Sequence, residues 1–374
     1  MPTSDSDAKN QRDDPQDQNS QENATAAREP SVEVPQTVAK KPAVALVLGS
    51  GGARGLAHIG VIEYLLEQGY EIKAIAGSSM GALVGAMYAM GELSTYRDWV
   101  AGLSQSDVFS LVDWTFSGGG FIRGHRIMGK LRELAGDANI EDLPLHFTAV
   151  TVDIDQGREV WLSDGPVYDA IRASIAIPGL FTPHRYRGRT LVDGGLINPV
   201  PVAPTLRTLT DLTVVVNLNG PETEPLHPPQ ASQPPPAESE SAEESGGILM
   251  KIRDYLDTFS MERTPTESSP GLMAVVMRSL ETMQAVLTRQ QMGVFAPDVV
   301  VDIPKDACMI HEFHRGEEMI TLGRRAIAEA LQRDLPRCRV NWAHALSEEA
   351  GAGAALELES VEVIHEPATK AKGD

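Results

Sequence analysis

Cysteines are scarce in this sequence, and it contains no long apolar run. The 374 residues include two cysteines, Cys308 and Cys338, whose spacing suggests neither a disulfide framework nor a metal site. No stretch of about 18 apolar residues is present, so no transmembrane helix is expected. The N-terminus is polar and acidic, which gives no support to a secretory signal. We therefore expect a cytoplasmic protein that reaches membranes only from the aqueous side.

Basic and aromatic residues are also few. The 32 Lys and Arg residues are outnumbered by 52 Asp and Glu residues, which gives a net charge of −20. This charge disfavours nucleic acid as a partner and weakens attraction to anionic lipid surfaces. Residues 1–40, 221–247 and 345–374 together carry −15 of the −20, so the rest of the chain is only mildly acidic. The 5% of aromatic residues gives no hint of a sugar or ring substrate.

These three acidic segments lack the apolar residues of a packed core. Residues 1–40 are rich in Asp, Gln, Ser and Asn, which predicts a disordered N-terminal segment. Residues 221–247 contain seven prolines and six glutamates, which predicts a flexible insertion. Residues 345–374 have low complexity, and we expect a disordered acidic tail there. One folded domain is thus predicted over residues 41–344, interrupted by the insertion.

Within that domain, short apolar runs alternate with helix-like runs. This alternation is typical of an α/β protein with a parallel sheet covered on both faces. The runs predict strands over Ala43–Leu48, His146–Asp153, Arg158–Ser163, Leu212–Leu218 and Asp298–Ile303, and a last helix over Glu317–Leu331.

Two amphipathic segments follow the insertion. Apolar residues recur at helical spacing in residues 248–259 and again in residues 272–287. Amphipathic helices usually face a core, so we favour packing of both segments on the sheet. The alternative for residues 248–259 is a lid or an interfacial helix that touches lipid.

The clearest chemical signal is the run Gly77-Ser78-Ser79-Met80-Gly81, which lies between a strand-like run and a helix-like run. A G-x-S-x-G sequence in this context is typical of a nucleophilic serine on a tight turn. The glycines permit the turn and the close approach of another segment. Glycine and serine are common, so the pattern alone is weak evidence. It makes Ser79 the candidate nucleophile.

A second glycine cluster, Gly49-Ser50-Gly51-Gly52-Ala53-Arg54-Gly55, follows the strand predicted at Ala43–Leu48. Glycine-rich loops between a strand and a helix present backbone N–H groups to negative charge. A dinucleotide-binding loop would need glycine in place of Arg54, and a phosphate loop would need Gly-Lys-Ser/Thr, which is absent. The remaining interpretations are a structural turn, or an oxyanion hole formed by the N–H groups of Gly51, Gly52 and Ala53.

Two further segments complete the set. Leu191-Val192-Asp193-Gly194-Gly195 places a carboxylate at the end of a short apolar strand, where Asp193 could accept a proton from Ser79. An ordinary Asp-Gly turn would also explain this sequence. Upstream, Ala173-Ser174 resembles a helix end that is followed by the breaker Pro178-Gly179.

In this order the four segments resemble the patatin-like phospholipase family, and in particular its bacterial members similar to the neuropathy-target-esterase branch. The resemblance covers about residues 43–220, with weaker similarity to about residue 331. It implies a three-layer α/β sandwich with a central, mostly parallel sheet flanked by helices. Many members begin the first loop with Asp-Gly-Gly-Gly, whereas this chain has Gly49-Ser50-Gly51-Gly52 and keeps the amide donors.

The resemblance also implies roles for single residues. Ser79 would be the nucleophile and Asp193 the general base of a Ser–Asp dyad, with Gly51, Gly52 and Ala53 as the oxyanion hole. Arg54 fills the arginine position of the loop, where it could orient the loop, meet a lipid phosphate or brace the loop through a salt bridge. Neither a metal nor a cofactor is expected.

The implied activity is hydrolysis of carboxylic esters in phospholipids or lysophospholipids through an acyl-enzyme. The alternatives are a non-catalytic lipid-binding or regulatory protein of the same fold, and a nucleotide-binding α/β protein. An alternative mechanism is a Ser–Asp–His triad, for which His311 and His314 are the candidates. His58, on a predicted core helix, is expected to be structural. The sequence indicates neither head group, acyl chain nor oligomeric state.

Overall fold

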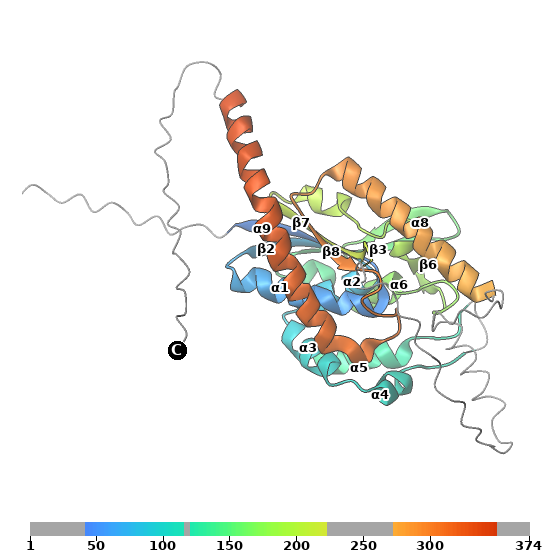
Figure 1. Ribbon diagram of the computed structural model, residues 1–374. Helices are drawn as coiled ribbons and strands as arrows, with labels where there is room; N and C mark the ends of the chain where they lie inside the picture. The colour runs from blue at the N-terminus through green and yellow to red at the C-terminus, as the bar shows by residue number, and fades with distance from the viewer. Residues whose placement is uncertain (1–41, 116–119, 223–271, 350–374) are drawn as a thin grey trace, which may run out of the picture. The chain divides into compact units, whose positions relative to one another are not determined.

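The computed structural model describes residues 42–115, 120–222 and 272–349 (Figure 1). The segment predicted to be disordered at residues 1–40 and the helix predicted at residues 248–259 lie outside these ranges. The same is true of the predicted insertion after residue 222 and of the tail after residue 349.

Within the described ranges, eight strands form one mixed sheet. Seven of them lie in the order β5-β6-β3-β2-β1-β7-β8, and β4 pairs with β3. Neighbouring strands from β3 to β8 in this order are parallel, whereas β4, β5 and β6 pair in antiparallel fashion. The strands are β1 (Ala43–Leu48), β2 (Glu71–Ser78), β3 (His146–Asp153), β4 (Arg158–Leu162), β5 (His184–Tyr186), β6 (Arg189–Asp193), β7 (Leu212–Gly220) and β8 (Val299–Pro304).

Helices connect most of the strands. The α-helices are α1 (Ala57–Glu67), α2 (Met80–Ala89), α3 (Leu93–Ala101), α4 (Gln105–Ser110), α5 (His125–Ala135), α6 (Val167–Ser174), α8 (Leu272–Phe295) and α9 (Gly316–Glu349). Short 3-10 helices are η1 (Gly52–Leu56), η2 (Ile140–Asp142), η3 (Gly194–Leu196), η4 (Ala203–Arg207) and η5 (Phe313–Arg315).

Both faces of the central strands are buried, each in a different core. Successive side chains of a strand point to opposite faces. Leu46 of β1 belongs to the large core that includes residues of α1, α2, α6 and α9. The next residue, Val47, belongs to a smaller core against which Met292 and Phe295 of α8 pack. Figure 1 shows α8 on one side of the sheet and α1 and α2 on the other. The predicted three-layer α/β sandwich is confirmed, and burial on both faces explains why β1 is apolar throughout.

The predicted strands are present within one or two residues of their expected bounds, and β3 matches them at both ends. The last helix is longer than predicted, because α9 continues through Pro336 to Glu349. Residues 345–349, which we expected to begin the acidic tail, are the last residues of α9 in the structure.

The prediction that residues 272–287 face the core is also wrong in part. They form most of α8, but its apolar residues Val275, Val276, Met283 and Val286 are between 41% and 51% exposed. The contact with the sheet comes instead from Met292 and Phe295, at the C-terminal end of the helix. Among the described side chains of α8, those that pack against a core lie at its C-terminal end.

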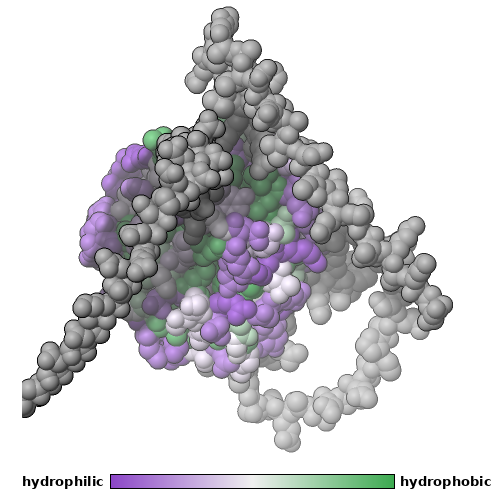
Figure 2. Space-filling model, turned by 90° about the vertical axis from the view of Figure 1, so that its left-hand side faces the viewer, coloured by the Kyte–Doolittle hydropathy of each residue, from purple (hydrophilic) through white to green (hydrophobic). Residues whose placement is uncertain are grey.

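Figure 2 shows the side of the protein that lies on the left in Figure 1. Hydrophilic residues cover much of this face, and hydrophobic residues are visible between them. In the part of the chain that the structure describes, no helix combines the length and the hydropathy needed to cross a bilayer.

Candidate active site

Strand β3 brings Ser79 and Asp193 together. Along β3, strand β2 ends where Ser78 pairs with Val150, and β6 ends where Asp193 pairs with the next residue, Thr151. Strand β4 pairs with β3 at both of these positions, so β2 and β6 must share the opposite edge. The C-terminal ends of β2 and β6 therefore meet along that edge. Ser79, the first residue after β2, consequently lies next to Asp193.

Ser79 occupies a strained turn at the N-cap of α2. Its φ of 56° and ψ of −122° form a combination that non-glycine residues rarely adopt. The flanking glycines are needed for close packing. A Cβ on Gly77 would lie 2.4 Å from the carbonyl oxygen of Gly81, and a Cβ on Gly81 would lie 2.0 Å from that of Leu48. Ser79 thus lies at the positive end of the α2 dipole, as the G-x-S-x-G pattern predicts.

Ser174, the last residue of α6, holds this turn in place. The backbone N–H of Ser79 donates to Ser174 Oγ at 2.9 Å. The Ser174 hydroxyl in turn donates to the Val150 carbonyl of β3 at 2.7 Å. Ser174 is fully buried. In the sequence, Ala173-Ser174 is one of the four segments that resemble the family, but no role for Ser174 can be predicted from it, because its partner Ser79 lies far away along the chain.

Asp193 is a buried carboxyl group with one free oxygen. Its Oδ1 accepts a hydrogen bond from the Gly195 N–H at 2.7 Å, and its Oδ2 has no hydrogen-bond partner among the described residues. Burial raises the pKa of Asp193 to about 7, and the nearby Ser79 side chain and the Gly195 N–H counteract part of that rise. A carboxylate with this pKa is a much stronger base than an exposed aspartate, whose pKa is about 3.9.

The glycine loop lies beside Asp193, but its three candidate amides differ. The Ala53 N–H donates to the Ile310 carbonyl at 3.0 Å and is therefore already occupied. No hydrogen bond from the N–H of Gly51 or Gly52 is found among the described residues. Both glycines line the same cleft as Asp193. Two of the three predicted oxyanion donors are thus available to a ligand in this structure.

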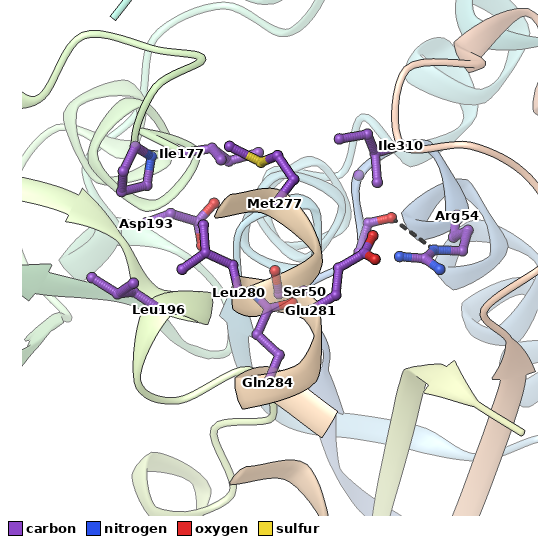
Figure 3. A pocket seen from close by; sticks show the side chains of 13 residues that line it. Ser50, Arg54, Ile177, Asp193, Leu196, Met277, Leu280, Glu281, Gln284 and Ile310 are labelled. Carbon is purple, nitrogen blue, oxygen red and sulfur yellow. Dashed lines mark hydrogen bonds between the residues drawn. The ribbon is translucent and has the colours of Figure 1, made fainter. Parts of the chain in front are cut away.

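The buried side chain of Arg54 holds the glycine loop in place through hydrogen bonds. It donates to the carbonyl oxygens of Gly51 and Lys305. Figure 3 shows Glu281 pointing from α8 toward Arg54. Burial lowers the pKa of Arg54, and the charge of Glu281 acts against that shift. These contacts support the predicted bracing of the loop, although through hydrogen bonds to carbonyls. A contact with a lipid phosphate remains a prediction.

A narrow cleft lies between the glycine loop, Asp193 and α8 (Figure 3). Its volume is about 70 Å³, compared with roughly 300–1,000 Å³ for typical ligand pockets. From α8 it is lined by Met277, Leu280, Glu281 and Gln284. Ser79 is only 1% exposed and Asp193 only 4%. Helix α8 therefore lies over the side of the cleft that Asp193 lines.

Neither candidate histidine of the alternative triad, His311 or His314, is hydrogen-bonded to Asp193 among the described residues. His311 lies next to Ile310 in the segment over the glycine loop, and His314 Nε2 lies 3.5 Å from Gln105 Nε2. Buried His58 bonds through Nε2 to the Gly49 carbonyl at 2.9 Å, and burial lowers its pKa to about 4, as befits a structural histidine. Within the same ranges, no group of three His, Cys, Asp or Glu residues is arranged to hold a metal ion.

Comparisons with known proteins identify the family of this chain. Residues 46–206, which include Ser79, Ser174 and Asp193, match the model of the patatin-like phospholipase family. An uncharacterized NTE family protein of Mycobacterium tuberculosis is 36% identical over 330 residues, which cover 78% of this chain and 92% of that protein. A Mycobacterium bovis protein of the same family matches to the same extent.

More distant matches cover less or are weaker. Lysophospholipase nte1 of Emericella nidulans is 36% identical over 165 residues, which are 43% of this chain and 11% of that protein. Among solved structures, VipD from Legionella pneumophila is 13% identical with a TM-score of 0.35, over 79% of this chain and 67% of that one. On the strength of the family match and the near full-length similarity to the mycobacterial proteins, this chain belongs to the patatin-like phospholipase family and, within it, to the NTE family proteins.

Proposed function

We propose that the protein is a serine acyl hydrolase that cleaves carboxylic esters of phospholipids or lysophospholipids with a Ser79–Asp193 dyad. The observation that carries this proposal is the meeting of β2 and β6 along β3, which puts a serine on a strained turn beside a buried carboxyl of raised pKa. Membership of the patatin-like phospholipase family supports a lipid substrate.

In the proposed mechanism Asp193 takes the hydroxyl proton of Ser79 as Oγ attacks the ester carbonyl. The resulting oxyanion accepts hydrogen bonds from the N–H groups of Gly51 and Gly52. When the tetrahedral intermediate collapses, the Asp193 proton passes to the leaving alcohol and an acyl-Ser79 ester remains. A water molecule then gives its proton to Asp193 and attacks this ester, which releases the fatty acid and restores both side chains.

Apolar side chains in the cleft suit an acyl chain as the occupant. Ile177, Leu196, Leu280 and Ile310 line it around Asp193. Burial of methylene groups against such side chains is favourable by about 0.8 kcal/mol for each group. We therefore place the fatty-acyl part of the substrate in an opened form of this cleft, and the head group toward solvent.

The decisive experiment measures fatty-acid release from lysophospholipids, diacyl phospholipids and a short-chain nitrophenyl ester, in the presence of EDTA. We expect release by the native protein, and a loss of at least about 10²-fold in kcat for Ser79→Ala and for Asp193→Asn. The matched control is Ser106→Ala, which removes an exposed hydroxyl from α4.

A fluorophosphonate probe provides a second measurement, because it reacts covalently with an activated serine. It should label the native protein and Ser106→Ala but not Ser79→Ala. Equal fatty-acid release by the native protein and Ser79→Ala would refute the proposed nucleophile. Absence of both release and labelling in a folded protein that still binds lipid would favour the non-catalytic lipid-binding alternative.

A further inference from the structure

Helix α8 presents apolar side chains on two opposite faces. Met277 and Leu280 lie on the inner face, where they line the cleft beside Asp193. The outer face carries Val275 and Val286, which are 44% and 41% exposed. A helix in a globular protein normally buries one apolar face and exposes a polar one. Packing among the described residues therefore does not account for the apolar outer face of α8.

The outer-face patch consists of Val275, Val276, Met283, Val286 and Val294, all exposed. Along α8 their successive spacings are one, seven, three and eight residues, which keeps all five on one side of the helix. Three of the spaces between them are filled by the small or uncharged residues Ser279, Thr282 and Gln290.

The charges of α8 are sorted between its faces. Its basic residues, Arg278 and Arg289, are exposed beside the outer-face patch, and its single acid, Glu281, lines the cleft opposite Arg54. The patch therefore carries positive charge and no carboxylate, although the whole chain has a net charge of −20. An apolar stripe flanked by arginines is the pattern of a helix that lies in the head-group region of a membrane.

The inner face of α8 lines the cleft beside Asp193, so a membrane contact that moved α8 would change access to this cleft. In this structure the cleft between α8 and Asp193 has a volume of about 70 Å³, which is too small to hold a lipid ester with a long acyl chain. The helix is held to the sheet by Met292 and Phe295 at its C-terminal end. The part that covers the cleft lies toward the N-terminal end, so it can swing away about the packed C-terminal end.

We propose that α8 is a lid that a membrane surface opens: the outer-face patch inserts among lipid head groups, and this movement lifts Met277 and Leu280 from the dyad. The purpose of the lid rests on the proposed lipid hydrolysis, whereas the binding of α8 to lipid does not. A lipid bilayer fits better than a protein partner, because the same helix would deliver the site to its aggregated substrate. The charge pattern further specifies a surface that contains anionic lipid.

The binding test uses protein with Ser79→Ala, so that no lipid is consumed. Sedimentation with vesicles of phosphatidylcholine, alone or mixed with phosphatidylglycerol, measures the affinity. We expect Val275→Ser, Met283→Ser and Val286→Ser together to weaken binding to both vesicles on the order of tenfold or more, because the bound apolar area is lost. Arg278→Gln with Arg289→Gln should weaken binding only to the vesicles that contain phosphatidylglycerol.

The matched control is Leu66→Ser, which removes an apolar side chain that is 41% exposed on α1, as Val286 is on α8. This variant should bind both vesicles like the parent protein. Unchanged binding by the triple variant would overturn the proposal. A triple variant that binds vesicles normally but changes from dimer to monomer in sedimentation velocity would identify the patch as a contact between copies of the chain, and would overturn it equally.

The activity test uses the same substitutions in the protein that retains Ser79. Hydrolysis of the soluble nitrophenyl ester should be unchanged in the triple variant, whereas hydrolysis of vesicle phospholipid should fall in proportion to binding. If the native protein hydrolyses neither substrate, the proposed function fails while the vesicle-binding result still decides the lipid contact. If the triple variant retains full activity on vesicle lipid, the lid proposal fails while the hydrolase assignment stands.

Discussion

Asp193 is a carboxyl group enclosed at the end of β6, with one oxygen bonded to Gly195 and the other without a partner among the described residues. Because burial raises its pKa to about 7, the basic carboxylate form predominates only above neutral pH. We expect kcat/KM for the soluble nitrophenyl ester to fall about tenfold for each pH unit below that pKa. A pH–rate profile from about pH 5 to 9 measures this. A rate that stays flat down to about pH 5 would contradict Asp193 as the base.

The same burial costs stability when Asp193 is ionised. Its pKa is about 7 in the folded protein but about 3.9 in an unfolded chain. Between these values the folded state binds more protons, so the free energy of unfolding attributable to this group decreases as pH rises from about 4 to 7. Above pH 7 the whole penalty is present.

Asp193→Asn should therefore become more stable relative to the native protein as the pH rises. The neutral amide has no such penalty, so the difference in Tm between variant and native protein should shift in favour of the variant between about pH 5 and 8. Thermal unfolding followed by circular dichroism at both pH values provides the measurement. Other effects of the substitution, such as an unpaired amide group, act at both pH values and cancel. An identical difference in Tm at the two pH values would contradict a raised pKa.

Ser174 should act as a positioning residue. Ser174→Ala removes the oxygen that accepts the Ser79 N–H, so the strained turn loses its support. We expect kcat to fall on the order of tenfold with little change in KM, and a loss of about 1–3 kcal/mol in stability. Thr205→Val is the control, because Thr205 is a buried residue whose hydroxyl bonds a nearby carbonyl away from Ser79. A similar fall in kcat for this control would show that lost stability, rather than lost positioning, explains the effect.

At the scale of residues, the sequence predicted what depends on local pattern. Ser79 and Asp193 each lie in a short glycine-bearing segment that ends a strand, and that context is visible in sequence. The hydrogen bond of the Ala53 N–H could not be predicted, because its acceptor, the Ile310 carbonyl, lies far away in the sequence. The role of Ser174 was hidden for the same reason, because it depends on how α6 packs against β3.

At the scale of elements, the periodicity of apolar residues predicted that α8 is a helix. It did not predict which face of α8 is covered by neighbouring elements. Apolar residues of α8 occur on two faces of the helix, so either face could have been the packed one. The outcome depends on Met292 and Phe295, which reach the smaller core, and on the cleft, which receives Met277. When a helix is apolar on two faces, the sequence does not show which face packs on the sheet. The second apolar face of α8 is the one that we propose to contact lipid.

The pairing of α1 with α9, seen side by side in Figure 1, depends on two glycines at their crossing. A Cβ on Gly323 of α9 would lie 2.0 Å from the Ala57 carbonyl, and one on Gly60 of α1 would lie 2.0 Å from that of Ile320. Neither backbone can yield without separating the helices. We expect Gly323→Ala to lower the free energy of unfolding by about 1–3 kcal/mol.

The control for this prediction is Gly129→Ala in α5, where an added Cβ would meet no atom within 4 Å. That substitution should instead stabilise the protein by up to about 1 kcal/mol, since alanine favours helix more than glycine does. Urea unfolding of both variants measures the two changes. The two changes in the free energy of unfolding need not be equal in size. A stabilising effect of Gly323→Ala would contradict the close crossing of α1 and α9.

At the scale of the whole molecule, two properties are divided between different parts of the chain. The described elements hold the sheet, the candidate dyad and α8, whereas residues 1–40, 221–247 and 345–374 hold −15 of the net charge of −20. The charge that opposes approach to an anionic surface is thus carried mostly by segments that contain none of the candidate site residues. The positively charged patch on α8 can coexist with an acidic protein for this reason.

Removing residues 1–40 together with residues 350–374 should therefore separate catalysis from surface attraction. We propose that neither segment belongs to the acyl hydrolase domain. The kcat for the soluble ester should therefore be unchanged, and the free energy of unfolding should stay within about 0.5 kcal/mol of the native value. Binding to vesicles that contain phosphatidylglycerol should become tighter, because the removed segments carry a net charge of −7. That gain should shrink as salt rises, since the screening length falls from about 10 Å at 0.1 M to about 3 Å at 1 M. Vesicle sedimentation at several salt concentrations measures the effect, and a truncated protein that loses activity on the soluble ester would place part of the catalytic domain in the removed segments.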